Sequence, residues 1–331
     1  KTNVTIRGAY AATNDADLPG PYGATNWPTI ITRNPASSNR VMSINGVTNC
    51  ILERITLTGG YQTTGYGGGL YIAGSTGLVI SACVISNNTL YIQNSLIAGG
   101  GIYAINSIVA VSNCLVRDNL LIATDARMPY GGGIYAENGR LNLFNSMIVT
   151  NRCTGGTGGR YGGGLYINAA ACQARNCLVA GNTVLTGNGD GIYTIGSSSL
   201  ILENCTVANN SGQGINRGAG SVAMTNSIVW GNGDDLTGTM SVAYCDIQTA
   251  NDIFWTNGIN GCISNNPIFK NANAADYHLG RNSPCVNTGT NLDWMGGALD
   301  LDGNKRLVGI QLDMGAYEYP SPLSGTIFFV Y

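Results

Sequence analysis

The acidic and basic residues of the central chain are the first candidates for chemistry. Cleavage of a sugar chain needs paired carboxylates, or a base beside a cation, on one face of the protein. The candidates in this sequence are Asp118, Asp125, Asp190, Arg127 and Arg160. They do not recur at matching positions of the repeat described below, and no two of the acids share an expected strand. A carbohydrate-active enzyme, either a polysaccharide lyase or a glycosidase, is therefore the alternative hypothesis and not the leading one.

A second chemical candidate lies near the C-terminus, in the stretch Asp-Leu-Asp-Gly-Asn at 300–304. Asp300, Asp302 and Asn304 place oxygen atoms at alternate positions around a glycine, a spacing that suits calcium. The alternative is an Asx turn that closes the end of the fold. Calcium is the one candidate cofactor, and none is required. We expect the single histidine, His278, to pack and not to catalyse.

Tyrosines form the third group of candidates, and they suit binding more than catalysis. Five follow a Gly-Leu or Gly-Ile pair and point outward by strand parity: Tyr71, Tyr103, Tyr135, Tyr166 and Tyr193. Three more lie in the variable segments between repeats: Tyr66, Tyr130 and Tyr161. A flat ring with a hydroxyl suits sugar stacking or partner docking. The alternative, which we favour for the column of five, is an aromatic ladder that covers and stiffens one sheet.

The composition excludes several classes of partner. Of the 331 residues, 48 are glycine and only 10 % are charged, and the net charge is −2. A net charge of −2 with so few charged residues gives no positively charged surface for binding nucleic acid. No apolar run is long enough to cross a bilayer, and no signal peptide opens the sequence. Because the sequence begins with Lys1, we expect a mature or trimmed product.

A repeat organises most of the chain, and it has to position all of these residues. Each copy begins with Gly, then Leu or Ile, then usually Tyr. A Cys or Ser follows, then Ile or Val two residues later, and Asn three residues after that. The step from Gly to Asn is 18 or 19 in six copies, which begin at Gly69, Gly101, Gly133, Gly164, Gly191 and, more weakly, Gly214. Such constancy is the signature of a solenoid.

The apolar residues inside one copy alternate with period two in three short runs, for example at 134–136, 141–143 and 146–148. Period two indicates strands, and three short strands per copy indicate a three-sided coil. No coil can bury its inward row alone, so the coils must stack. The sequence predicts an all-β, single-stranded, right-handed parallel β-helix of roughly eight or nine coils.

This fold divides the chain into three regions. We expect an N-terminal cap and first coil at 1–40, coils at 41–250, and an irregular C-terminal cap at 251–331 that ends in an apolar strand at 327–331.

Two inward columns follow from the repeat. The Asn column suits a tight corner, because Asn tolerates left-handed backbone and its amide can bond to its copy one coil away. The Cys or Ser column should hold free thiols, since stacked Cβ atoms lie about 4.8 Å apart and a relaxed disulfide needs about 3.8 Å. Outside this column, Cys262 and Cys285 are the candidate disulfide.

The step from each Asn to the next repeat Gly varies, at 13, 14, 13, 9 and 4 residues. These excursions leave from the same corner, so we expect them to stack into a wall. Insertions at one corner of a solenoid usually mark the binding face.

The Gly-Gly-Gly-Ile-Tyr and Val-x-x-Asn motifs resemble the repeats of polymorphic outer-membrane proteins. More broadly, they resemble the right-handed parallel β-helix (pectin lyase-like) superfamily. The tail resembles the end of bacterial choice-of-anchor Q proteins, through Asn-Pro-Ile-Phe at 266–269, Asp-Tyr-His-Leu at 276–279, Ser-Pro at 283–284, Asp-Leu-Asp-Gly-Asn-Lys-Arg at 300–306 and Asp-Met-Gly-Ala-Tyr-Glu-Tyr at 313–319. Cys-Val-Asn at 285–287 departs from that family's pattern. The resemblance implies a secreted, extracellular or cell-surface protein without a defined activity.

Together these observations lead to one hypothesis. We expect a non-catalytic β-helix with a structural, adhesive or assembly role, such as that of an adhesin or a filament. Its candidate partners are a polysaccharide or surface glycan at the wall and the tyrosines, and further copies of the chain through the open helix ends or the C-terminal strand.

Overall fold

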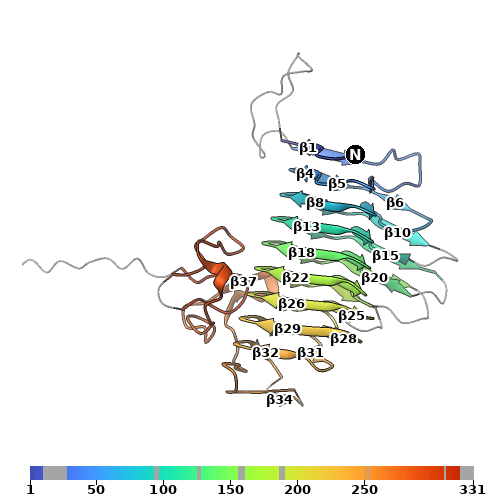
Figure 1. Cartoon of the computed structure of the whole chain (residues 1–331). Coiled ribbons are helices and arrows are strands. Elements are labelled where there is room, and N and C mark those ends of the chain that lie inside the picture. The colour runs from blue at the N-terminus through green and yellow to red at the C-terminus, as the bar shows by residue number, and fades with distance from the viewer. Residues whose placement is uncertain are drawn as a thin grey trace, which may run out of the picture.

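The chain folds into a stack of coils whose three sides form three parallel sheets, seen edge-on in the computed structural model of Figure 1. The structure describes residues 1–9, 28–92, 97–124, 128–155, 161–185, 191–249, 251–252, 254–308 and 311–320. Within these ranges the sheets have eight, nine and nine strands. The predicted all-β parallel β-helix of eight or nine three-sided coils is confirmed.

We number the sides in the order in which one coil visits them. The side 1 sheet contains β3 (Met42–Asn45), β7 (Leu70–Ala73), β12 (Ile102–Ile105), β17 (Ile134–Glu137), β21 (Leu165–Asn168), β25 (Ile192–Ile195), β28 (Gln213–Arg217) and β31 (Asp234–Thr237). The side 2 sheet contains β1 (Thr5–Arg7), β4 (Ile51–Glu53), β8 (Thr76–Ser81), β13 (Ile108–Ser112), β18 (Arg140–Phe144), β22 (Ala171–Arg175), β26 (Ser199–Glu203), β29 (Ser221–Thr225) and β32 (Ser241–Ala243). The side 3 sheet contains β2 (Thr29–Thr32), β5 (Ile55–Thr58), β9 (Val84–Ser86), β14 (Leu115–Arg117), β19 (Met147–Val149), β23 (Leu178–Ala180), β27 (Thr206–Ala208), β30 (Ile228–Trp230) and β33 (Asp246–Ile247).

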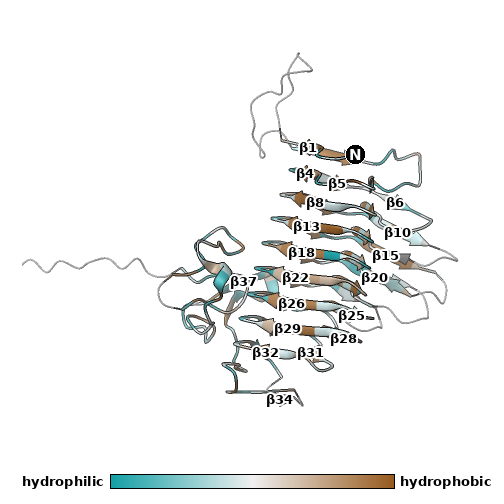
Figure 2. Cartoon of the chain, viewed as in Figure 1, coloured by the Kyte–Doolittle hydropathy of each residue, from teal (hydrophilic) through white to brown (hydrophobic). Residues whose placement is uncertain are grey.

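Each strand pairs with its copy one coil away, so equivalent side chains stack in columns. On side 1, for example, Tyr135 of β17 pairs with Tyr103 on one side and Tyr166 on the other. Inward columns of Leu, Ile and Val fill one continuous core along the axis. Figure 2 shows apolar and more polar residues alternating along these strands. This alternation with a period of two is the pattern that the sequence predicted.

An asparagine ladder runs inside the corner after side 3 and contains Asn88, Asn119, Asn151, Asn182, Asn210 and Asn232. At Asn151 the amide nitrogen donates to the side-chain oxygen of Asn182 (3.1 Å) and to the Val116 carbonyl (3.0 Å). Its oxygen accepts from the backbone and side-chain nitrogens of Asn119 (3.2 and 2.9 Å). The predicted bonding between copies is confirmed.

The backbone part of that prediction is wrong by one residue. The left-handed conformation falls on the residue before each ladder asparagine, namely Asn87, Asp118, Thr150, Gly181, Asn209 and Gly231. The ladder asparagine therefore keeps ordinary backbone geometry, and its side chain turns inward.

The ladder also explains the fixed step to the repeat glycine. A Cβ atom on Gly133 would lie 2.8 Å from the Asn151 amide nitrogen and 2.6 Å from the Gly164 carbonyl oxygen. Both contacts are closer than real Cβ atoms tolerate, and the second involves backbone that cannot move aside. The glycine and asparagine columns thus require each other.

The excursions form an additional sheet that the sequence analysis did not predict. Their first residues are strands of a five-stranded parallel sheet: β6 (Tyr61–Gln62), β10 (Thr89–Ile92), β15 (Leu120–Ala123), β20 (Arg152–Gly155) and β24 (Thr183–Val184). A small separate core lies beneath them, formed by Leu90, Leu121, Ala123, Cys153 and Val184. Two further strands, β11 (Ile97–Ala98) and β16 (Pro129–Tyr130), pair where two excursions return. The expected wall is thus a regular structure.

The C-terminal region has two parts with different positions. The first contains β34 (Asn251–Asp252) and β35 (Trp255–Thr256), and its Trp255 and Cys262 join the central core at the end of the stack. The second contains β36 (Phe269–Asn271), the 3₁₀ helices η1 (Ala272–Ala274) and η2 (Asp293–Met295), and β37 (Asp276–Leu279). Residues 269–308 and 311–320, which we name the tail, lie beside the stack and not across its end (Figure 1).

Specific contacts hold the tail against side 3. Tyr277 and Tyr317 pack on small residues of β23 and β27, including Ala180 and Ala208. Asparagines at the corner between sides 2 and 3 donate to tail carbonyls, for example Asn176 to Leu299 (2.7 Å). We expected residues 251–331 to form one cap, with the turn at 300–304 closing its end. The tail instead packs against the outer face of side 3.

The predicted disulfide between Cys262 and Cys285 is wrong, because the two thiols belong to different clusters. Cys262 is a free thiol in the central core, whereas Cys285 is a free thiol under the tail. The Cys285 thiol donates to Asp246 Oδ2 at 3.0 Å. Among the helices of the described residues, none is long and apolar enough to cross a membrane.

Candidate functional site

The five repeat tyrosines form a ladder on the outer face of side 1. Neighbouring ring centroids from Tyr71 to Tyr193 are 5.5, 5.0, 5.0 and 5.3 Å apart, and the rings lie within 17° of parallel. Four of the five are buried, with exposed fractions from 3 to 9 %. Because ring faces that stack on each other are not free for a ligand, this column covers and stiffens the sheet, as the favoured alternative predicted.

A second column, which we name the covering column, lies over the ladder. It contains Tyr66, Ala98, Tyr130 and Tyr161, each just before a left-handed glycine. Ala98 pairs with Tyr130 between β11 and β16, and Tyr130 bridges to Tyr161. Three members are tyrosines, and the fourth is an alanine.

Each covering tyrosine contacts the ladder tyrosine of the following coil. The ring centroids are 4.6 Å apart for Tyr66 and Tyr103, and 4.8 Å apart for Tyr130 and Tyr166. Tyr161 lies 4.7 Å from Tyr193 in the same way. By this register Ala98 is the residue that would cover Tyr135, but its side chain is a single methyl group.

A cleft of about 400 Å³ lies at this position, and we name it the tyrosine cleft. Its lining residues are Tyr66, Tyr71, Ala98, Tyr103, Ile105, Tyr130, Tyr135, Glu137, Tyr166 and Asn168. Glu137, at the end of β17, is the one charged residue among them. The cleft thus combines aromatic surface with a carboxylate and an amide.

Hydrogen bonds fix the polar groups of the tyrosine cleft. The Tyr103 hydroxyl donates to Glu137 Oε2 (3.0 Å), and Asn168 Nδ2 donates to Glu137 Oε1 (3.1 Å) and to the Tyr135 hydroxyl (3.3 Å). Burial, reinforced by the Glu137 charge, raises the pKa of Tyr103 and of Tyr135 well above the usual value. Both phenols therefore stay protonated near neutrality.

Of the candidate catalytic residues, the structure describes one, Asp118. Asp118 lies at a corner beside side 3, where it pairs with Arg117 (3.0 Å) and accepts from the Thr150 hydroxyl (2.6 Å). Asp125, Arg127, Arg160 and Asp190 lie outside the described residues. A catalytic pair among these residues stays a prediction.

The candidate calcium residues form a hydrogen-bonded turn. Oδ1 of Asp300 accepts from the backbone of Asp302 (3.0 Å) and Asn304 (2.8 Å), and Oδ2 accepts from the backbone of Glu318 (2.9 Å). Asp302 instead reaches His278. Among the described residues, no three acidic, histidine or cysteine side chains converge on one point. This geometry is that of the Asx turn; calcium binding stays a prediction, which melting curves with and without EGTA test.

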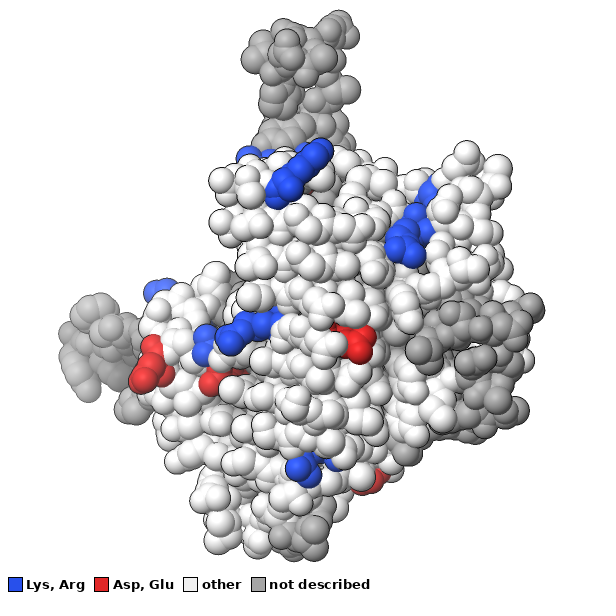
Figure 3. Space-filling view, turned by 45° about the vertical axis from the view of Figure 1, so that its right-hand side comes forward, with Lys and Arg blue, Asp and Glu red and all other residues white. Residues whose placement is uncertain are grey.

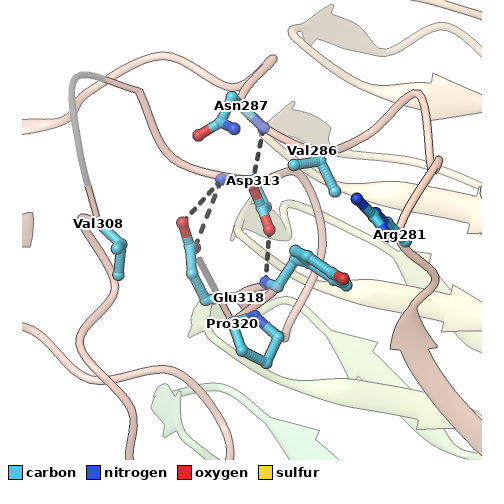
Figure 4. A pocket seen from close by; sticks show the side chains of 8 residues that line it. Arg281, Val286, Asn287, Val308, Asp313, Glu318 and Pro320 are labelled. Carbon is cyan, nitrogen blue, oxygen red and sulfur yellow. Dashed lines mark hydrogen bonds between the residues drawn. The ribbon is translucent and has the colours of Figure 1, made fainter. Parts of the chain in front are cut away.

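A second cavity, of about 480 Å³, lies in the tail and is shown in Figure 4. Asp313 and Glu318 face it, and burial raises the pKa of Glu318 to about 8 and that of Asp313 above its usual range. Asp313 accepts from the backbone of Asn287 and Tyr319, and its own backbone donates to Glu318. These carboxylates are occupied in holding the tail together around the buried Arg306.

The sequence analysis named all eight tyrosines of the two columns but missed Ala98, Glu137 and Asn168. A signal for Ala98 was present, because it stands before Gly-Gly-Gly where three other copies have Tyr. Glu137 and Asn168 carried no such signal, since their position has no fixed residue type: it holds Asn45 in the first coil and Ala73, Ile105 and Ile195 in others.

Comparisons with known proteins extend only to the fold. No family model matches the sequence, and no curated protein matches it. Among solved structures, the crystal structure of pectate lyase Pel9A is similar, with a TM-score of 0.42 and 12 % sequence identity over 97 % of each chain. The assignment as a parallel β-helix rests on the three stacked sheets described above.

Proposed function

We propose that this protein is a secreted or cell-surface β-helix that acts without catalysis and binds a polysaccharide or surface glycan in the tyrosine cleft. The observation that carries this proposal is the mixed lining of the cleft. Tyrosine surface covers the apolar faces of sugar rings, while Glu137, Asn168 and the phenols can exchange hydrogen bonds with sugar hydroxyls. Clefts of this size and composition are usual ligand sites.

The location at the cell surface or outside the cell is supported by the tail motifs. Their resemblance to choice-of-anchor Q proteins is the basis for this part of the proposal. The surface is also poor in charge. Figure 3 shows single charged side chains separated by wide uncharged areas on the face it draws. Such a surface favours partners that are themselves weakly charged.

The direct experiment screens the full chain against a glycan array and measures the affinity for each hit by titration calorimetry. We expect Tyr130→Ala to weaken binding at least tenfold, because Tyr130 lines the tyrosine cleft. Tyr161→Ala is the matched control, since it removes a ring from the same column but Tyr161 does not line the cleft. Equal losses in both variants, or no binding by the unchanged protein, would contradict the proposal. Turnover of any hit, with release of unsaturated or reducing ends, would establish the enzyme alternative.

An assembly role forms the second part of the proposal, and the N-terminal end of the stack supports it. The first coil leaves Ile6 46 % exposed and Ile30 59 % exposed. Ile6 also lines a hollow of about 350 Å³, together with residues such as Ile44 and Leu52. Open strand edges with apolar side chains favour addition of further strands. Mass photometry should detect polymers that Ile6→Lys with Ile30→Lys disperses; a monomer at all concentrations would exclude this role.

A further inference from the structure

We propose that the Ala98 position is a slot for one neutral pyranose ring, which takes the place of the tyrosine ring that the covering column lacks. This inference rests on the proposed glycan binding and specifies where and what the cleft binds.

The register of the covering column locates the slot. Tyr66, Tyr130 and Tyr161 each place a ring 4.6 to 4.8 Å from the ladder tyrosine of the next coil. The same rule assigns Ala98 to Tyr135, yet the covering ring nearest to Tyr135 is Tyr130, at 6.5 Å and tilted by 49°. In the described part of the chain, a ring is therefore missing at a position where its neighbours on both sides of the column are present.

The surroundings of the missing ring are suited to a flat ligand. Tyr66 and Tyr130 border the slot along the column, and its floor is formed by the ring edges of Tyr103 and Tyr135, whose faces stack within the ladder. The slot is closed toward the next coil by Asn168, which the Tyr135 hydroxyl and Glu137 hold in place. A volume of about 400 Å³ is near the lower end of the range for small-molecule sites, so the cleft suits one or two sugar rings.

The polar groups select among ring-shaped ligands. Glu137 accepts from the Tyr103 hydroxyl and Asn168, and the Tyr135 hydroxyl also interacts with it, which leaves at least one of the roughly four acceptor positions of a carboxylate for a further donor. A sugar ring carries hydroxyls at several positions that can supply it, whereas a phenol has a single hydroxyl and an unsubstituted aromatic ring would bury that oxygen without a donor. A uronate would bring a like charge toward Glu137. These points favour a neutral sugar over both alternatives.

The test fills the slot by substitution. Ala98→Tyr completes the covering column and should weaken binding of neutral oligosaccharides at least tenfold while leaving the melting temperature equal or higher. Ala98→Ser is the matched control, because it leaves the slot open, and should bind within twofold of the unchanged protein. Glu137→Gln should weaken binding without filling the slot. The probes are cellohexaose, mannohexaose and maltohexaose, with oligogalacturonate as the anionic probe and p-cresol as the aromatic one.

The outcomes separate this inference from the proposed function. If Ala98→Tyr binds a neutral probe as well as the unchanged protein does, while Tyr130→Ala does not, the slot is wrong and glycan binding stands. Tighter binding of oligogalacturonate or p-cresol than of every neutral probe would overturn the ligand class. If none of the probes and no array glycan binds the unchanged protein, both the slot and the proposed function are overturned.

Discussion

The asparagine ladder and the Arg306 centre are both buried polar groups, but they are built in opposite ways. In the ladder, each interior asparagine bonds to two copies of itself and to backbone, so its polar atoms are satisfied. Arg306 is single and fully buried. Its Nη2 donates to the carbonyls of Asp313 (2.8 Å) and Gly315 (2.6 Å), while Nη1 has no hydrogen-bond partner among the described residues and Nε lies 3.6 Å from Glu318.

The difference bears on how far a local defect should spread. The ladder crosses from coil to coil, so damage at one level leaves unsatisfied groups in both neighbours. The Arg306 centre joins parts of the tail to one another, and burial lowers the pKa of Arg306, against the nearby carboxylates that raise it. We therefore expect ladder defects to destabilise the stack and Arg306 defects to loosen the tail alone.

The largest effect should come from Asn151→Ala in the middle of the ladder. The substitution leaves two donors of Asn119 without their acceptor and removes one donor each from the Val116 carbonyl and the Asn182 oxygen, although the latter still accepts from the Asn151 backbone nitrogen at 3.0 Å. Each unsatisfied buried group costs roughly 1 to 3 kcal/mol, and local rearrangement recovers part of that cost. We therefore expect the unfolding free energy to fall by about 4 kcal/mol. Denaturant titration followed by circular dichroism measures it.

The control for that change is Asn232→Ala at the last position of the ladder. Asn232 is half-buried, and water can replace part of its bonding. We expect a loss of about 1 kcal/mol. Equal losses at the two positions would show that the ladder does not act through coupling between coils.

A smaller and more local effect is expected from Arg306→Met. Removing one partner of a buried charge cluster costs about 3 kcal/mol in comparable cases. Because the centre lies within the tail, hydrogen exchange should accelerate at 269–320 and stay slow in β17, β18 and β19. Arg281→Met is the control, since Arg281 borders the same cavity but is exposed. Faster hydrogen exchange throughout the coils of Arg306→Met would contradict the expectation that a defect at Arg306 loosens the tail alone.

The smallest effect should appear as a pH dependence at Asp246, where the last coil meets the tail. Burial raises the pKa of Asp246 to about 7, against hydrogen bonds from Cys285 and Asn265. The folded state therefore binds a proton more tightly than the unfolded state, whose pKa is about 3.9. The resulting stabilisation is complete below about pH 4 and is lost as the pH rises through 7.

The melting temperature should thus fall between pH 5 and pH 8, by an amount equivalent to about 1 to 2 kcal/mol. Asp246→Asn should reduce this slope. It should not abolish it, because Glu318 also has a raised pKa, of about 8, and acts in the same direction. The pKa of His278 is also raised. Burial alone would lower this pKa, but the hydrogen bonds and charges of Asp276 and Asp302 raise it by more. An unchanged slope in Asp246→Asn would contradict the assignment.

The sequence was sufficient to predict the coils because they repeat. Leu141, Leu143 and Ile148 were identified as inward residues by period two, and their copies confirmed the spacing in every coil. The tail offered no such redundancy. Its contacts join residues far apart in the chain, such as Asn176 and Leu299, and no local pattern records them.

The errors have the same origin. The bridge between Cys262 and Cys285 was inferred from their position outside the ladder, and proximity in a non-repeating region cannot be read from spacing. The excursion sheet was missed because strands such as β6 and β24 contain only two residues. The proposed slot could have been predicted from the sequence, since comparison of the copies shows an alanine at position 98 where three other copies have tyrosine.

The placement of the excursions has a consequence for how such a protein can evolve. The variable segments, whose steps in residue number are 13, 14, 13, 9 and 4, all fall between the asparagine of one copy and the glycine of the next, where the three main sheets are not interrupted. Insertions and deletions there leave the alignment of every column unchanged. Small changes in the length of these segments can therefore alter the outer surface, and with it the choice of ligand, while the three main sheets stay the same.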